Sequence, residues 1–251
     1  MGDVLLETAS LSRSFGALVA VNNVSIGFRR GQVHAIIGPN GAGKTTFLNL
    51  LSGELRPSGG RILWKGQPIT GESPDLRSRR GIGRSFQKTS LFPGLSCMES
   101  CLVASQSRLS SSMRFFRPAD SLVDVRARAE RALSLAGIAH LSDKDATSMS
   151  YGEQRQLELA LLLATEPELL LLDEPLAGLG QEESRRVVAL IESLARDHTV
   201  ILIEHDMDAV FQVAELLTVM VRGEVLLTGA PAVVRKSREV QEAYLGAEDA
   251  P

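Results

Sequence analysis

A run of eight residues has the composition of a loop that binds phosphate. It fits the pattern G-x-x-x-x-G-K-[ST] in full and consists of Gly38, Pro39, Asn40, Gly41, Ala42, Gly43, Lys44 and Thr45. Its glycines let the backbone curl so that successive N–H groups point at one anion, and the helix expected after it adds partial positive charge. Lys44 would reach the β- and γ-phosphates of a nucleotide, while the Thr45 hydroxyl would ligate Mg²⁺. The loop therefore predicts a nucleoside triphosphate site.

Polar side chains follow two further apolar runs. Four leucines at residues 169–172 lead into Asp173 and Glu174. The apolar residues 200–203 lead, one residue later, into His205. Because an open parallel sheet binds ligands outside the carboxyl ends of its strands, these side chains are expected beside the phosphate loop. There, Asp173 suits Mg²⁺, Glu174 can accept a proton from an attacking water, and His205 can donate a hydrogen bond to a γ-phosphate. Each functional interpretation has a structural alternative. The acidic pair could simply form a turn before the proline that follows it, and His205 could be a hydrogen-bonded structural residue at the end of a strand.

A third motif begins at Ser150 and ends at Glu153. With Tyr151 and Gly152 between them, these residues satisfy the S-x-x-E capping box ahead of an apolar helical stretch. The structural interpretation is that the motif starts a helix. The functional one is an anion site, since Gly152 is a poor helix former and would let a ligand oxygen approach the backbone beside the serine hydroxyl. The residues alone leave both interpretations open.

The scaffold that positions these motifs is predicted to be an α/β fold, because apolar segments alternate with helical ones. Buried parallel strands are predicted at residues 33–37, 169–172 and 200–203, with helices over 44–52 and 181–196. Antiparallel strands are predicted at residues 4–11, 24–28 and 61–64, and a later hairpin arm at 224–228.

The stretch from about residue 94 to 164 differs because it carries few strand signals. Helices are predicted there over residues 122–135 and 151–164. The segment 105–117 interrupts this pattern with a serine-rich run and then Met-Arg-Phe-Phe-Arg, and is predicted to form a loop. Either a solvated linker or an insertion that faces a membrane or a partner accounts for it.

Composition excludes several classes of protein. The chain has 251 residues, of which 44% are hydrophobic and 23% charged, as in a globular protein with its own core. Its 27 basic and 30 acidic side chains leave a net charge of −3, which argues against a dedicated nucleic-acid binder. No apolar run approaches the ~18 residues that span a bilayer and no signal peptide is recognised, so a cytoplasmic location is expected. Cys97 and Cys101 are predicted to be reduced thiols, because helical positions four apart place Cβ atoms about 5–6 Å apart, beyond the roughly 3.5–4.5 Å of a disulfide.

Taken together and in this order, the motifs resemble the nucleotide-binding subunit of ABC transporters over about residues 4–246. The matching segments are Walker A at residues 38–46, the Q-loop glutamine at Gln87, the signature at residues 150–154, Walker B at residues 169–174, the D-loop at residues 177–180 and the switch histidine at His205. Phe15 lies where the family stacks an aromatic ring on adenine, with a buried strand phenylalanine as the alternative.

The resemblance implies an α/β P-loop NTPase fold of the ABC ATPase type, with a parallel-sheet core, an N-terminal antiparallel β subdomain and a helical subdomain. Residues 1–251 would form a single domain. Its RecA-like core would comprise about residues 1–93 and 165–251, and its helical subdomain about residues 94–164.

The resemblance also implies ATP and Mg²⁺ as cofactors. Glu174, His205 and Gln87 would be catalytic, and Thr45, Gln87 and Asp173 would hold the metal. The implied nucleotide contacts are Phe15, Gly38, Pro39, Asn40, Gly41, Ala42, Gly43, Lys44, Thr45, Thr46, Ser150, Gly152 and Gln154.

The family's signature motif acts in trans, so two subunits, identical or paralogous, would sandwich two ATP molecules. Ser150 and the Gly152 amide would then face the partner's γ-phosphate. Transmembrane permease subunits and, indirectly, a periplasmic solute-binding protein are the other implied partners, at the cytoplasmic face of the inner membrane and without nucleic acid. Two departures stand out: Tyr151 replaces the commoner glycine, and Gly180 stands where the family often has Asp or Asn, so a polar contact across the interface between the two ATP sites is expected to be absent.

Finer features resemble the branch that imports branched-chain amino acids and that also includes importers of urea, amides and aromatic acids. They are Phe15-Gly16, Ala20-Val21-Asn22, residues 91–95, the insertion at 113–116, residues 151–154 and Tyr244-Leu245-Gly246. We therefore expect an ATP-hydrolysing subunit of a membrane importer. The alternatives are the ATPase of an exporter or lipid-extraction system, and a soluble ABC ATPase acting on DNA or ribosomes.

Overall fold

A parallel β-sheet forms the centre of the protein. The computed structural model describes residues 3–85, 91–107 and 120–248. The central sheet has the strand order β11-β10-β4-β9-β8-β7, and only β11 runs antiparallel to its neighbour. Its strands are β4 (Val33–Ile37), β7 (Ile82–Arg84), β8 (Leu169–Asp173), β9 (Thr199–Ile203), β10 (Leu216–Val221) and β11 (Glu224–Gly229). The parallel strands predicted at residues 33–37, 169–172 and 200–203 are confirmed.

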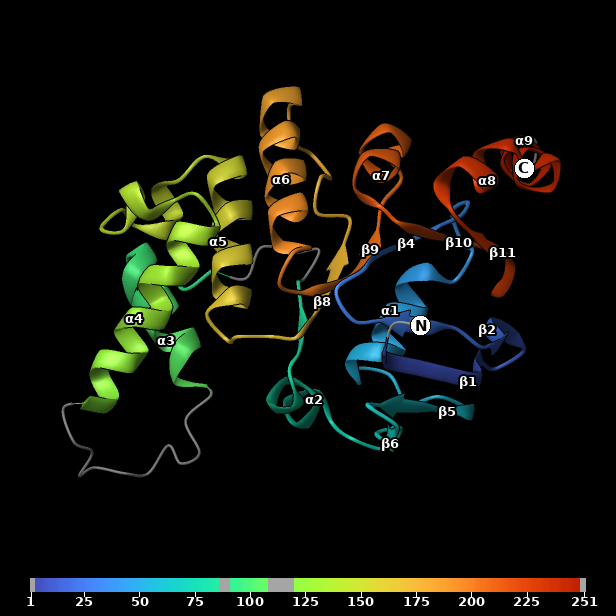
Figure 1. The fold of residues 1–251 in the computed structure, drawn as a ribbon, viewed down its shortest axis with the longest axis horizontal. Helices are drawn as coiled ribbons and strands as arrows, with labels where there is room; N and C mark the ends of the chain where they lie inside the picture. Colours follow the sequence, from blue (N-terminus) through green and yellow to red (C-terminus); the bar gives the residue numbers. More distant parts are fainter. Residues whose placement is uncertain (1–2, 86–90, 108–119, 249–251) are drawn as a thin grey trace.

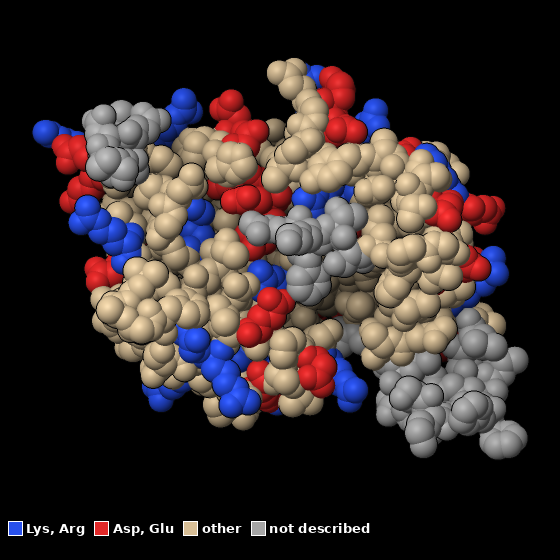
Figure 2. All heavy atoms as spheres, turned by 180° about the vertical axis from the view of Figure 1, so that it is seen from behind, with Lys and Arg blue, Asp and Glu red and all other residues tan. Residues whose placement is uncertain are grey.

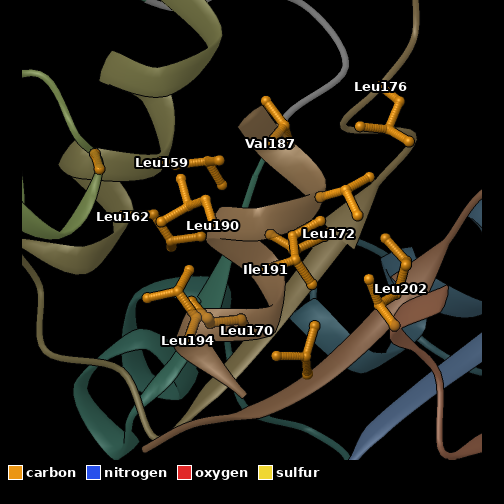
Figure 3. Packing of buried hydrophobic residues seen from close by; sticks show 14 of the residues in the cluster. Leu159, Leu162, Leu170, Leu172, Leu176, Val187, Leu190, Ile191, Leu194 and Leu202 are labelled. Atoms are coloured by element: carbon orange, nitrogen blue, oxygen red, sulfur yellow. The ribbon is translucent and has the colours of Figure 1, made fainter. Parts of the chain in front are cut away.

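Alternate residues of the leucine run in β8 pack into two separate hydrophobic cores. Leu169 and Leu171 pack on the side of α1 (Lys44–Ser52), and Leu170 and Leu172 on the opposite side. Figure 3 shows Leu170 and Leu172 near Ile191 of α6 (Gln181–Leu194). A strand covered on both faces needs apolar residues at every position, and this explains the unbroken run.

A second, antiparallel sheet covers the other side of α1. It has the order β2-β1-β5-β6, and β3 also pairs with β1. Its strands are β1 (Val4–Phe15), β2 (Leu18–Val24), β3 (Gly27–Arg29), β5 (Gly59–Trp64) and β6 (Gln67–Pro68). Buried side chains of α1, including Phe47 and Leu51, share one core with both sheets.

The prediction of one strand over residues 24–28 is wrong. Val24 ends β2 and Gly27 begins β3, and both strands pair with β1. Ser10 in β1 has a φ of 50°, and its N–H donates to the Ser25 side chain at 2.8 Å instead of continuing the ladder. The irregularity in β1 therefore divides its partner into two strands.

Helices of the middle segment lie together beside α6 (Figure 1). They are α3 (Cys97–Gln106), α4 (Asp120–Leu135) and α5 (Tyr151–Leu163). Two short 3₁₀ turns, Ala139–Leu141 and Ala146–Ser148, lie between α4 and α5. The helices predicted over residues 122–135, 151–164 and 181–196 are confirmed to within two residues at either end. Of the predicted loop 105–117, the first residues belong to α3 and its end, and 108–117 lie outside the described residues.

The remaining helices are α2 (Pro74–Arg80), α7 (Met207–Val213), α8 (Pro231–Lys236) and α9 (Arg238–Glu248). Cys97 and Cys101 are buried free thiols, and burial raises the pKa of Cys101 to about 12. Among the described residues, no helix combines the length and apolar character needed to cross a membrane. Figure 2 shows basic and acidic residues interspersed over one face of the molecule.

Candidate nucleotide-binding site

The predicted phosphate loop connects β4 to α1 and depends on glycine at two positions. Gly38 has a φ of 151° and Gly43 a φ of 93°. A Cβ atom at Gly38 would lie 2.1 Å from the Met220 carbonyl oxygen, and one at Gly43 would lie 2.2 Å from that of Ala20. Neighbouring backbone thus touches the loop from two directions, and no side chain fits between them.

Lys44 lies over this loop at the start of α1. Its Nζ donates hydrogen bonds to the carbonyl oxygens of Gly38 at 2.7 Å and Pro39 at 3.0 Å. Burial lowers the pKa of Lys44, and the negative charges of Glu174 and Asp173 act in the opposite direction. The structure therefore brings the lysine and the predicted acidic pair into one electrostatic site.

The turn between β10 and β11 braces the loop from outside. The Gly223 N–H donates to the Ala42 carbonyl at 3.0 Å, and the Gly223 carbonyl accepts from the Asn22 N–H at 2.8 Å. The Asn22 amide also donates to Glu224 at 2.6 Å. The β10–β11 turn thus holds the phosphate loop through a backbone hydrogen bond, and β2 holds that turn in place.

A hollow of about 520 Å³ opens above the loop. It is lined by residues 40–46 together with Phe15, Leu18, Val19, Ala20, Glu174 and Arg222. Phe15 is 43% exposed, and the Arg13 guanidinium carbon lies 4.5 Å from the centre of its ring. The structure therefore brings Phe15, Lys44, Thr45, Thr46 and Glu174 to one hollow, and the alternative of a buried strand phenylalanine is wrong.

Asp173, at the end of β8, is a buried carboxylate with two differently placed oxygens. Its Oδ2 lies 3.3 Å from Nη2 of Arg84, while its Oδ1 is buried and has no hydrogen-bond partner within the described part of the chain. The Asp173 N–H donates to the Ser85 hydroxyl at 3.3 Å. Burial raises the pKa of Asp173, and the Arg84 charge opposes that rise.

Glu174 turns out of the strand into the hollow. Its φ is 49°, in the left-handed region that non-glycine residues seldom adopt. Its N–H donates to the Ile203 carbonyl of β9 at 2.9 Å, and its own carbonyl accepts from the Ala177 N–H at 3.1 Å. These two hydrogen bonds hold the unusual backbone conformation that directs the side chain toward the phosphate loop.

At the end of β9, the buried residue is Glu204 and the exposed one is His205. Glu204 accepts backbone hydrogen bonds from Leu176 at 2.8 Å and from His205 at 3.0 Å, so it ties this strand end to the segment after Glu174. Burial raises the pKa of Glu204. The His205 side chain is 69% exposed and does not line the hollow. Its contact with a γ-phosphate stays a prediction.

Ser150 caps α5, as the structural interpretation of its motif predicts. The Ser150 hydroxyl accepts from the Glu153 N–H at 3.3 Å, and the Glu153 carboxylate accepts from the Ser150 N–H at 2.8 Å. Gly152 is buried, and a Cβ there would meet the Glu183 side chain of α6 at 2.4 Å. Gln154 donates to the Met149 carbonyl at 3.2 Å. Because Glu183 is a flexible side chain that can move aside, this contact does not by itself require glycine, and the functional interpretation of the motif stays a prediction.

Ser150, Gly152 and Gln154 do not line the hollow of their own chain. Gln87 lies outside the described residues. Of the predicted site, the structure therefore gathers the phosphate loop, Phe15 and Glu174 around one hollow, with Asp173 beside them.

Comparison with known proteins agrees with this arrangement. A family profile described as "ABC transporter" matches residues 21–177, more than half of the chain and from before the phosphate loop to beyond β8. The chain belongs to the ABC transporter family. A second profile, "Branched-chain amino acid ATP-binding cassette transporter", matches residues 224–250 of this ABC ATPase.

Curated relatives of this ABC ATPase match it over nearly their full length. It is 37% identical over 255 residues to "High-affinity branched-chain amino acid transport ATP-binding protein LivG" of Salmonella typhimurium, covering 98% of this chain and 99% of the relative. It is 38% identical over 253 residues to "High-affinity branched-chain amino acid transport ATP-binding protein BraF" of Pseudomonas aeruginosa, with the same coverage.

Solved structures agree with the fold. A nucleotide-free ATP-binding cassette from an ABC transporter superposes with a TM-score of 0.84 at 26% identity, covering 96% of this chain and 98% of that one. The ADP conformation of an ATP-binding cassette gives a TM-score of 0.83 at 26% identity, covering 97% and 99%. The predicted ABC ATPase fold, with its parallel-sheet core, antiparallel β sheet and helices, is confirmed.

Two residues of this ABC ATPase site were missed by sequence reasoning. Arg222 belongs to an Arg-Gly pair that is typical of a turn, but no local sequence pattern indicates that this turn lies against the phosphate loop. Arg84 ends the three-residue strand β7, which is too short for periodicity to reveal. Only the tertiary arrangement brings both arginines to the site.

Proposed function

We propose that this chain is the ATP-hydrolysing subunit of a membrane importer for branched-chain amino acids or related small hydrophobic solutes. The observation that carries the proposal is the match of residues 224–250 to the branched-chain profile. A phosphate loop is common to all P-loop NTPases, whereas this C-terminal match lies outside the general ATPase profile. It favours the importer over an exporter motor or a soluble ABC ATPase.

ATP would occupy the hollow above the phosphate loop. The triphosphate would lie on the N–H groups of the loop, where Lys44 would exchange its contacts with the Gly38 and Pro39 carbonyls for contacts with the β- and γ-phosphates. The exposed Phe15 ring would stack on the adenine. The proposal is supported by the presence of both groups in the lining of the same hollow.

Mg²⁺ fits this site because Asp173 keeps one buried oxygen, Oδ1, without a protein partner in the described residues. Oxygen ligands are those that Mg²⁺ prefers, and the Thr45 hydroxyl and Gln87 would complete the protein's share of them. When bound, the metal neutralises developing charge on the β- and γ-phosphate oxygens.

Hydrolysis would use the side chains at the strand ends. Glu174 would accept the proton of the attacking water, and the backbone held by Ile203 would keep its carboxylate over the phosphates. His205 would donate a hydrogen bond to the γ-phosphate, which requires its exposed side chain to turn toward the hollow. Gln87 would complete the catalytic set.

The complete site would form between two ATPase subunits, either identical or paralogous. Residues 94–164 would act as a helical subdomain that presents Ser150, Gly152 and Gln154 to the nucleotide of the partner. The ATPase pair would bind transmembrane permease subunits at the cytoplasmic face of the inner membrane, with a periplasmic solute-binding protein acting through them.

The test is transport-coupled ATP hydrolysis. The chain is affinity-purified from a membrane extract, its membrane partners are identified, and the complex is reconstituted into vesicles with the solute-binding protein. Leucine, isoleucine and valine should each stimulate ATP hydrolysis, whereas arginine should not. Stimulation only by solutes of another class would replace the proposed cargo. Co-purification with ribosomes or nucleic acid and no permease would overturn the importer itself.

A further inference from the structure

Arg84 joins three elements of the fold at the edge of the nucleotide site. It ends β7, and its side chain is 10% exposed. One terminal nitrogen, Nη2, lies 3.3 Å from Asp173 Oδ2 at the end of β8. The other, Nη1, donates at 2.9 Å to the hydroxyl of Ser52, the last residue of α1, and lies 3.3 Å from Oε2 of Glu54, two residues further along the chain. One guanidinium thus spans from the helix that follows the phosphate loop to the carboxylate of β8.

The Asp173 carboxylate is oriented by this contact. Arg84, the last residue of β7, holds Oδ2 of the Asp173 side chain. The hydroxyl of the next residue, Ser85, accepts a hydrogen bond from the Asp173 backbone N–H, so two consecutive residues fix both the side chain and the backbone of Asp173. The second oxygen, Oδ1, remains buried without a hydrogen-bond partner in the described chain. A buried acceptor without a partner is costly, and in native proteins it commonly indicates an ion or water that completes it.

We propose that Arg84 is a positioning residue for the divalent cation of the nucleotide site: it holds Oδ2 of Asp173 so that Oδ1 faces the metal. The inference rests on the proposed function, because it needs the nucleotide and Mg²⁺ to occupy the hollow. Arg84 does not touch either ligand. It acts on the metal through Asp173, as groups behind metal ligands do in other proteins.

The guanidinium group of Arg84 has the geometry that these contacts require. Its two terminal nitrogens bind Asp173 on one side and the Ser52 and Glu54 pair on the other. A lysine would keep the positive charge but would present a single ammonium group, which cannot hold both partners at their present positions. Charge and geometry can therefore be separated by substitution.

The experiment measures how strongly Mg²⁺ improves nucleotide binding. A fluorescent, non-hydrolysable ATP analogue is titrated into the full chain once with Mg²⁺ and once with EDTA, and the ratio of the two Kd values gives the contribution of the metal. In Arg84→Gln this contribution should fall about 10–100-fold, as is typical when a group behind a metal ligand is removed. The Kd in EDTA should stay within about twofold, since the phosphate loop is untouched.

Two variants complete the design. Arg80→Gln removes the same charge from a nearby surface arginine, paired with Glu72 at 2.6 Å, and should behave as the wild type. Arg84→Lys should retain the folded structure and show an intermediate loss of the metal contribution. If Arg84→Gln does not fold, Arg84→Lys decides the question by the same two titrations.

The possible results separate the proposed role of Arg84 from a purely structural role and from a failure of the proposed function. A metal contribution equal to that of the wild type in both Arg84 variants overturns the inference, and so does an equal loss of affinity with and without Mg²⁺, which would show a purely structural role. Failure of the wild type to bind the analogue would instead refute the proposed function. In the Asp173→Asn background, Arg84→Gln should cause no further loss, because its effect passes through that carboxylate.

Discussion

Lowering the pH from 7 to 5 should destabilise this protein through one buried histidine. His34 in β4 is 1% exposed, its Nε2 lies 2.7 Å from the Thr218 hydroxyl, and its ring centre lies 4.8 Å from that of Phe28. Burial lowers the pKa of His34 from 6.5 to about 4, because a charged imidazole in this position would lose its hydration. The folded protein therefore keeps this ring neutral under mildly acidic conditions.

The size of the effect follows from proton linkage. As the pH falls through about 6.5, the unfolded chain protonates His34, whereas the folded chain does so only near pH 4. The unfolded state then binds more protons, so the stability contributed by the neutral ring is complete above about pH 6.5 and is lost toward pH 4. The difference between the two pKa values corresponds to about 3 kcal/mol in total. About 2 kcal/mol of this is lost between pH 7 and pH 5.

Urea unfolding followed by circular dichroism at both pH values measures this loss. His34→Gln is the matched variant, because glutamine can hydrogen-bond Thr218 and does not titrate. The wild type should lose about 2 kcal/mol more than the variant on acidification, since other acid-sensitive groups such as Asp173 and Glu204 are common to both proteins and cancel. Equal losses in the two proteins would refute the reasoning.

Three further predictions concern the nucleotide site. Lys44→Ala should weaken ATP binding roughly 10- to 100-fold in calorimetry, because it removes a charged hydrogen bond worth about 1.5–3 kcal/mol; unchanged affinity would show that the loop is not the nucleotide site. Glu174→Gln should lower the rate of hydrolysis about 10²–10⁴-fold and leave ATP binding intact, so that an ATP-bound dimer persists in light scattering after size exclusion. A wild-type rate in that variant would remove Glu174 from the mechanism. Ser150→Asp should keep its melting temperature, because aspartate caps a helix as well as serine does, but lose ATP-dependent dimerisation and hydrolysis; wild-type ATPase activity would leave capping as the only role of Ser150.

Patterns that are local in sequence predicted most of the fold and part of the site. In three places, a few consecutive residues are enough to predict the local structure. These are the leucine run of β8, the phosphate loop between a strand and a helix, and the capping box at Ser150. Once three strand ends were predicted in one parallel sheet, the meeting of the phosphate loop with Asp173 and Glu174 followed from topology.

Features that depend on distant partners could not be predicted in this way. The division of residues 24–28 into two strands originates in the bulge at Ser10, on another strand. The contact of Arg84 with Asp173 depends on the register between β7 and β8, and the hydrogen bond from the Leu176 N–H to Glu204 joins residues 28 positions apart. None of these leaves a periodic signal at its own position.

The bracing of the phosphate loop by the β10–β11 turn has a consequence for synthesis of the chain. Asn22 and Glu224, whose hydrogen bond joins the two braces, are 202 residues apart in sequence. On the ribosome the loop emerges long before the turn that fixes it, so a nascent chain carries the complete Walker sequence without the backbone contacts of Gly223. Nucleotide binding should therefore begin only after Gly223 and Glu224 have left the ribosome and have packed against the phosphate loop and β2.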